Sequence, residues 1–328
     1  MGDILIHPLM KKKQSFIVKI KNIFRRIAKW FKSVKLFNLL GDTFSAFGEH
    51  RVMKMSAALS YYTIFSLPAM LVIIISMCSI FFGQEIVEGR VFKVMNDYVG
   101  DQTALQLQSM LKQSVLKKTN VWATIIGGVT LLLSASGIFG EIQDSLNYMW
   151  GLKAKPKKGW ILMLINRLMS FSMLLILGFI LLISLVLTTV LDLFLNFLAG
   201  HFSQTFIKII SYMDYGVILL AVSTLFMFIF KFLPDGKVRW KDAYLGALIT
   251  GGLFMVGKFL IGLYVSSTNL TAYGGTASLA ILLIWIYYSA IIMYLGAEFT
   301  QVFAAFKGRK IEPKKFAVKV EVKEKEKK

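Results

Sequence analysis

The stretch "TASLAILLIWIYYSAIIMYLGAEFTQVF" covers Thr276–Phe303 and is apolar over most of its length. A helix needs about 20 predominantly apolar residues to cross a bilayer core, so this stretch predicts a transmembrane helix. It carries one carboxylate, Glu298, and it follows two glycines, Gly274 and Gly275. A charge at the centre of such a helix costs about 2.5–3.5 kcal/mol on insertion scales and normally faces the protein interior or water. Glu298 therefore indicates an interior-facing side of this helix.

The whole chain has the composition of an integral membrane protein. It has 328 residues, of which 56% are hydrophobic, and its mean hydropathy is +0.64. The formal net charge is +20. In a soluble protein this charge would indicate a nucleic-acid partner. Here the collection of Lys and Arg in cytoplasmic segments is a sufficient cause, and no nucleic-acid partner is expected.

Six apolar blocks predict six transmembrane helices in an all-α fold. They are Ser56–Gly83, Val121–Phe139, Gly159–Ala199, Met213–Leu233, Asp242–Val265 and Thr276–Phe303. The two termini and every second connecting segment between the blocks would lie on the same side of the membrane, and together they carry 30 Lys and Arg. The connecting segments on the other side carry 6. This bias predicts that both termini are cytoplasmic. The third block is about twice the length needed for a bilayer core, so it is either one long tilted helix or a broken one.

Three regions follow from this pattern. Residues 1–43 are basic and contain an amphipathic helix, which we expect to lie in the headgroup layer with Arg25, Arg26 and Lys29 on anionic lipid. The alternative is a cytosolic helix packed on the protein's own loops. Residues 44–306 form the membrane domain, with short extracytoplasmic helices expected between the first two spans. Residues 307–328 are charged and of low complexity, which predicts disorder.

No catalytic motif is present. The chain lacks G-x-S-x-G, H-E-x-x-H, a P-loop and G-x-G-x-x-G. It has a single cysteine, Cys78, and three isolated histidines, His7, His50 and His201, so no metal site is expected. The sequence therefore predicts a protein that is not an enzyme and that needs no cofactor.

Charges within the spans mark a candidate cavity or transport path. At about 1.5 Å per residue, Arg167 and Glu298 lie roughly 12 Å and 10 Å from the cytoplasmic ends of their helices, so they could pair. Lys258 lies nearer the outer face, among small residues that permit close packing. On the last span, one helical sector holds Tyr287, Tyr294, Glu298 and Gln301. Such a stripe either lines a cavity or ties helices together.

Four stretches resemble the YihY/BrkB family of bacterial inner-membrane proteins. They are "SAALSYYTIFSLPAML" (56–71), "SGIFGEIQDSLNYMWG" (136–151), "FLPDGKVRWKDAYLGALITG" (232–251) and "AYGGTASLAILLIWIYYSAIIMYLGAEFTQ" (272–301). The resemblance implies a six-helix protein of the bacterial cytoplasmic membrane. The family once carried a ribonuclease BN label, which the residues do not support. Residues within the family-like motifs are Ser60, Tyr61, Tyr62, Gln143, Asn147, Trp150, Tyr273, Gly274, Trp285 and Glu298.

Two functions fit these features. The buried charges, the aromatic stripe and the unusually long third block favour a transporter or flippase-like exporter of a lipid or amphiphile. The basic tails and the interfacial helix also fit a non-transporting membrane scaffold or envelope-assembly factor. Membrane lipids are the expected partners, with anionic headgroups at the cytoplasmic face. The sequence leaves homo-oligomerisation, the substrate and the energy source open.

Overall fold

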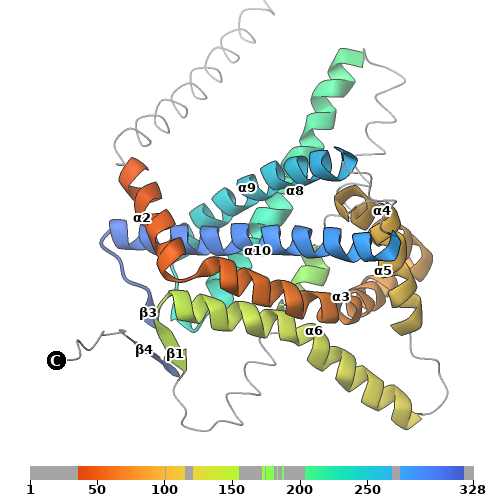
Figure 1. Cartoon of the computed structure of the whole chain (residues 1–328), viewed down its shortest axis with the longest axis horizontal. Coiled ribbons are helices and arrows are strands. Elements are labelled where there is room, and N and C mark those ends of the chain that lie inside the picture. The colour runs from red at the N-terminus through yellow and green to blue at the C-terminus, as the bar shows by residue number, and fades with distance from the viewer. Residues whose placement is uncertain are drawn as a thin grey trace, which may run out of the picture.

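The structure is a computed structural model that describes residues 36–99, 101–114, 121–154, 172–173, 175–180, 183, 187, 204–267 and 274–320. This part of the chain is predominantly helical (Figure 1). Its helices are α2 (Leu36–Glu49), α3 (Val52–Phe82), α4 (Gln84–Val99), α5 (Asp101–Ser114), α6 (Val121–Met149), α8 (Gln204–Phe232), α9 (Trp240–Ser267) and α10 (Gly274–Phe306). The short strands are β1 (Leu152–Ala154), β2 (Gly236–Lys237), β3 (Glu312–Pro313) and β4 (Ala317–Lys319).

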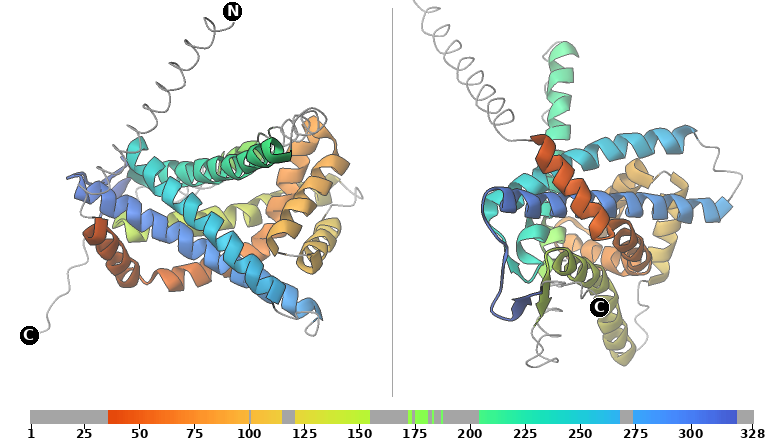
Figure 2. Two further views of the ribbon diagram at one scale, coloured as in Figure 1. Left: turned by 90° about the horizontal axis from the view of Figure 1, so that it is seen from above. Right: turned by 60° about the vertical axis from the view of Figure 1, so that its left-hand side comes forward.

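The last long helix, α10, occupies the centre of the bundle. It packs against α9 on one side, α3 on the other and α2 near its C-terminal end. Two further helix pairs, α3–α6 and α8–α9, complete the arrangement (Figures 1 and 2). The main hydrophobic core joins these helices and includes Leu146, Trp150, Phe230 and Tyr294, each at most 2% exposed. The stretch that predicted the membrane fold is thus also its central element.

Among the described residues, four helices are long and apolar enough to cross a membrane. They are Val52–Ile80, Tyr215–Phe232, Trp240–Leu263 and Leu279–Phe306. Large apolar side chains such as Phe259 and Leu220 are exposed on their surfaces, as lipid contact requires. The six-span count and the orientation stay predictions. Most of the third predicted span and the basic segment with Arg25, Arg26 and Lys29 lie outside the described residues.

Two glycines set the close crossing of α9 and α10. A Cβ atom on Gly246 would lie 1.8 Å from Thr300 Oγ1, and one on Gly296 would lie 1.7 Å from Thr250 Oγ1. Each threonine hydroxyl donates to the carbonyl four residues earlier, which is Gly246 for Thr250 and Gly296 for Thr300. The contact is therefore reciprocal, and small residues permit this close approach of membrane helices.

The junction of α2 and α3 lies directly before the candidate span Val52–Ile80. Arg51 has a left-handed backbone, with φ of 52°, which separates the two helices and is rare for a residue with a side chain. His50 stands beside it, and its backbone N–H donates to Ala46 O. At the other end of α3, Gly83 also takes positive φ, and α4 and α5 follow directly. These short helices confirm the helices predicted between the first two spans, and their extracytoplasmic position stays a prediction.

The prediction of disorder from residue 307 is wrong for residues up to 320. There β4 pairs antiparallel with β1, and β3 pairs with β2, at the end of the molecule opposite α4 and α5 (Figure 1). Ile311 and Ala317 are buried, and Ile311 joins the main core. Lys310, Lys315 and Lys319 are exposed, whereas Lys314 is half-buried and its ammonium group donates to Phe232 O at 3.1 Å. The remaining residues, 321–328, lie outside the described part. The fold therefore includes two small antiparallel pairs as well as helices.

Candidate functional site

Glu298 lies on α10 with no exposed surface, and an acid so placed needs a partner. Its Oε1 atom is 2.6 Å from His50 Nδ1, at the α2–α3 junction. The two residues are 248 positions apart in the chain. Among the described residues His50 is therefore the ion-pair partner of Glu298. The predicted partner, Arg167, lies outside the described part, so that pairing stays a prediction.

Three elements enclose the other sides of this ion pair. The Gln301 side chain, one turn along α10, can donate its amide to Glu298 Oε2 at 3.3 Å and to Met149 O at 3.2 Å. The ring of Tyr148, on α6, packs edge-on against the His50 ring with centroids 6.1 Å apart. The pair thus joins the α2–α3 junction to α6 and α10.

His50 is the titratable group of the pair that reaches solvent, with 28% of its side chain exposed. Its hydrogen bond to Glu298 raises the pKa of His50 above its usual value of 6.5, although partial burial acts in the opposite direction. The nearby charges of Glu298 and Glu49 also raise this pKa. His50 is therefore more often cationic near neutral pH than a free histidine.

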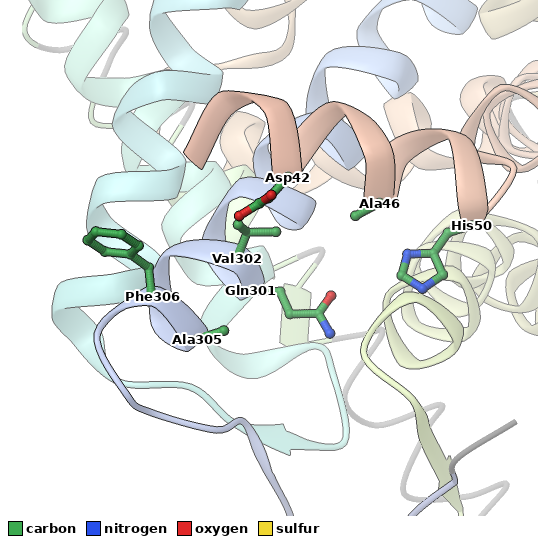
Figure 3. A pocket seen from close by; sticks show the side chains of 7 residues that line it. All are labelled: Asp42, Ala46, His50, Gln301, Val302, Ala305 and Phe306. Atoms are coloured by element: carbon green, nitrogen blue, oxygen red, sulfur yellow. The ribbon is translucent and has the colours of Figure 1, made fainter. Parts of the chain in front are cut away.

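A pocket of about 440 Å³ opens between α2 and the end of α10 (Figure 3). It is lined by Asp42, Ala46, His50, Gln301, Val302, Ala305 and Phe306. The walls are mostly apolar, and the polar groups are few. This volume falls in the range of small-molecule sites, about 300–1,000 Å³. His50 therefore lines this open pocket and also contacts the buried Glu298.

A second buried polar cluster gathers around Asp235, in the turn between α8 and β2. Gln143 Nε2 donates to Asp235 Oδ1 at 3.0 Å, and Asn147 Nδ2 donates to Asp235 Oδ2 at 2.9 Å. The Asp235 backbone N–H donates back to Asn147 Oδ1 at 2.8 Å. Its carbonyl accepts from the Lys314 backbone N–H at 2.8 Å. The cluster therefore connects α6, the α8–α9 turn and the C-terminal segment.

Two further contacts strengthen the same end of the molecule. Trp150, fully buried after α6, donates its indole N–H to Ala297 O on α10 at 3.3 Å. Arg309 pairs with Asp242, in the first turn of α9, at 2.8 Å. Asp242 is almost fully buried, so the guanidinium neutralises an otherwise isolated carboxylate. Both contacts favour a structural role for these residues.

The structure brings together only some of the residues named from the sequence. Glu298 and Gln301 lie beside His50, and Tyr294, one turn earlier on α10, is buried in the main core. Tyr287 and Lys258 are half-buried farther along α10 and α9. Tyr273, Arg167 and the basic trio Arg25, Arg26 and Lys29 lie outside the described residues. Gly274 is the first residue of α10, and Thr276 follows within that helix.

The remaining motif residues are spread over the bundle. Ser60 is buried and donates to Ser56 O, whereas Tyr61 and Tyr62 are exposed on α3 with their rings in edge contact. Trp285 is half-buried on α10 and packs edge-on against Phe254. Gln143, Asn147 and Trp150 belong to the structural contacts described above. No single site unites these residues.

Sequence reasoning missed His50, Asp42 and Asp235. His50 was set aside because isolated histidines carry no metal motif, and Asp42 lies in a helix not recognised as a separate element. The signal available for Asp235 was its position in a "LPDG" turn between two spans. Among the described residues no three His, Cys, Asp or Glu side chains are grouped as metal ligands.

Comparisons with known proteins place these features in a family context. A family model described as "Virulence factor BrkB" matches residues 43–319. A "UPF0761 membrane protein" of Tolumonas auensis is 28% identical over 291 residues, covering 84% of this chain and 89% of the relative. A Vibrio vulnificus protein of the same description is 27% identical over 253 residues, covering 74% of each chain. One from Pseudomonas aeruginosa is 28% identical over 269 residues, covering 78% of this chain and 62% of the relative. The names of these relatives state a membrane location and no enzymatic activity. No solved structure matches.

Proposed function

The chain belongs to the BrkB family of membrane proteins, and on that premise we propose that it is a transporter or flippase-like exporter of a lipid or amphiphile. We place it in the cytoplasmic membrane of a bacterium, with its basic segments on the cytoplasmic side. It performs no covalent chemistry in this proposal. Its partners are membrane lipids, including the anionic headgroups that its basic segments attract.

The observation that carries the proposal is the ion pair between Glu298 and His50 beside the α2–α10 pocket. A buried ion pair is weak evidence for stability, because desolvation offsets most of the attraction. Ionisable residues in membrane helices typically mark substrate or ion pathways. Here one member of the pair reaches a pocket large enough for a headgroup, which supports a role in substrate handling.

Reconstitution tests this proposal directly. Purified full-length protein is placed in liposomes that contain a trace of headgroup-fluorescent phospholipid, and the fluorescence left after an impermeant quencher is added measures lipid exchange between leaflets. We expect the protein to increase the quenched fraction and Glu298→Gln to slow exchange by about ten-fold or more. Glu85→Gln is the matched control, because Glu85 is an exposed carboxylate on α4 and should leave the rate unchanged.

The outcome that rejects the proposal is equally specific. If folded protein moves zwitterionic, anionic and neutral lipids no faster than empty liposomes do, then lipid translocation is not its function. Size-exclusion profiles and melting temperatures establish that the wild type and both variants are folded.

A membrane scaffold is the second candidate, and the packing of Tyr294 favours it. Tyr294 belongs to the stripe that either lines a cavity or ties helices together, and it is fully buried in the main core together with Trp150 and Phe230. In a scaffold, Glu298 and Tyr294 would only hold helices together. The scaffold then predicts that Glu298→Gln lowers the melting temperature while the reconstituted wild type moves no lipid.

A further inference from the structure

The α2–α10 pocket lies where a membrane helix leaves the hydrocarbon. Four of its lining residues, Gln301 to Phe306, belong to the last six positions of the candidate span Leu279–Phe306. The hydrocarbon core is about 30 Å thick and the bilayer with headgroups about 40–45 Å, so the ends of a long span lie in the headgroup layer. Phe306, which lines the pocket, is 43% exposed, so apolar surface is available at the mouth of the pocket.

His50 offers this pocket a hydrogen-bond donor. Its Nδ1 atom is engaged by Glu298, and an ionised carboxylate can only accept, so Nδ1 carries a hydrogen. In the imidazolium form the second nitrogen, Nε2, carries a hydrogen as well. Within the described part of the chain no hydrogen bond occupies Nε2, and His50 lines the pocket. An anionic oxygen in the pocket could accept this hydrogen bond.

Asp42 provides the opposite charge in the same pocket. It lies eight residues before His50 on α2, roughly 12 Å along the helix axis, and its side chain is exposed. No ion pair engages its carboxylate within the described ranges. Across the pocket, the Phe306 ring has the Lys307 ammonium 6.0 Å from its centre, so this ring already accepts a cation. Of the four remaining lining residues, Ala46, Val302 and Ala305 are apolar, and Gln301 is polar.

We propose that this pocket binds the zwitterionic headgroup of a phospholipid from the surrounding bilayer, with its phosphate on His50 Nε2 and its ammonium group beside Asp42. A purely anionic headgroup would meet the carboxylate of Asp42, with Glu49 and Glu298 close to His50. A purely cationic group would leave the His50 Nε2–H without an acceptor. The apolar residues Val302 and Phe306 of α10, which line the pocket, would contact the first part of the lipid chains. This inference rests on the proposed function and names its substrate class.

Nuclear magnetic resonance of the three histidines tests the assignment. Full-length protein with 15N-labelled histidine is placed in nanodiscs of phosphatidylglycerol, and the His50 signals are identified from their loss in His50→Gln. We expect soluble phosphoethanolamine to shift the His50 signals in a saturable way. Inorganic phosphate and ethanolamine, each presenting half of the headgroup, should bind at least ten-fold more weakly, because each loses one charge-assisted contact.

Two variants assign the two halves of the headgroup. Asp42→Asn should weaken phosphoethanolamine binding about ten-fold and strengthen binding of the anionic glycerol phosphate, because the variant removes the carboxylate that repels an anion. Glu85→Gln, at the far end of the molecule, should change neither. His50→Gln should abolish binding of both compounds, as measured by calorimetry. Should that variant fold poorly, His50→Gln combined with Glu298→Gln removes the unpaired buried charge and keeps the test available.

A second arm identifies the source of the headgroup. In nanodiscs of phosphatidylethanolamine, the His50 signals should already lie at the bound position, and added phosphoethanolamine should have no effect. If only the soluble compound produces the shift, the ligand is a free metabolite and the lipid assignment is wrong. If inorganic phosphate binds equally to the wild type and to Asp42→Asn, the pocket binds an adventitious ion only and the headgroup assignment is wrong.

These experiments distinguish a failure of headgroup binding from a failure of lipid transport. Headgroup binding without lipid exchange would reject the proposed function and retain the pocket assignment. Lipid exchange that is unaffected by Asp42→Asn and by the His50 variants would retain the function and reject this pocket as the substrate site.

Discussion

Asn147 and Asp235 hold each other through two hydrogen bonds of opposite direction, from Asn147 Nδ2 to Asp235 Oδ2 at 2.9 Å and from Asp235 N to Asn147 Oδ1 at 2.8 Å. An amide side chain is well suited to this position, because it donates and accepts at once. The contact fixes the end of α6 against the turn between α8 and β2, where both residues are buried.

Asn147→Ala should therefore destabilise the protein. It removes a donor to a buried carboxylate and the acceptor for a backbone N–H, with an expected loss of about 1.5–3 kcal/mol. Thermal unfolding in detergent, followed by circular dichroism, measures the change. Asn38→Ala on the exposed surface of α2 is the control and should have little effect. An equal melting temperature for Asn147→Ala and the control would show that the cluster contributes nothing.

The ion pair of His50 and Glu298 should show strong coupling in a double-mutant cycle. His50→Gln leaves a buried acid without its cation. His50→Gln and Glu298→Gln should therefore each lower the free energy of unfolding by more than half of the loss seen in the double variant. Coupling well above the ~0.6 kcal/mol average for polar pairs in membrane helices would support direct contact. Additive effects would contradict the pairing seen in the structure.

The same pair predicts a pH dependence. Because the pKa of His50 is raised above 6.5 in the folded protein, its stabilising effect is complete below pH 6.5 and is lost as the pH rises through the raised value. The stability difference between the wild type and His50→Gln should therefore shrink from pH 6 to pH 9. A difference that grows with pH would reverse the predicted sign.

The reciprocal glycine contacts of α9 and α10 give a matched pair of substitutions. Gly296→Ala would place a methyl group 1.7 Å from Thr250 Oγ1, and overpacking of this kind costs about 1–3 kcal/mol. Gly252→Ala, on α9, meets nothing within 4 Å and should be neutral or stabilising by up to about 1 kcal/mol. Melting temperatures of the two variants test the helix crossing, and equal values would contradict it.

The C-terminal segment should be needed for stability up to residue 320 and not beyond it. Removing residues 310–328 deletes β3 and β4 and the buried side chains of Ile311 and Ala317. We expect a clearly lower melting temperature for that truncation, whereas removal of 321–328 should leave it unchanged. If both truncations melt like the full chain, the strand pairs contribute no stability.

The predicted orientation can be tested with single cysteines at Lys12, Lys112 and Lys325 on a Cys78→Ser background. An impermeant thiol reagent applied to intact cells with a permeabilised outer barrier should label position 112 alone. Labelling at 325 without labelling at 112 would overturn the predicted arrangement of six crossings with both termini inside.

The sequence by itself determined that this is a helical membrane protein, and it identified Glu298 as an acid that must face the interior. Hydropathy, charge bias and helical spacing are properties of contiguous residues, so they can be read along the chain. The two short helices after α3 were predicted from the same local information, whereas the central position of α10 in the bundle is known only from its tertiary contacts. The C-terminal strands could not be predicted from local sequence. Their segment is rich in lysine and has only a few apolar residues, and the strands with which they pair are distant in the chain.

Only the tertiary structure decided which side chains meet. His50 reaches Glu298 across 248 positions, and Asp235 finds Gln143 and Asn147 across about 90. A hydrogen bond requires two atoms within about 3 Å, and that distance depends on how helices cross and not on composition. The crossing in turn depends on close contacts such as Gly296 against Thr250, which no periodicity of a single helix reveals.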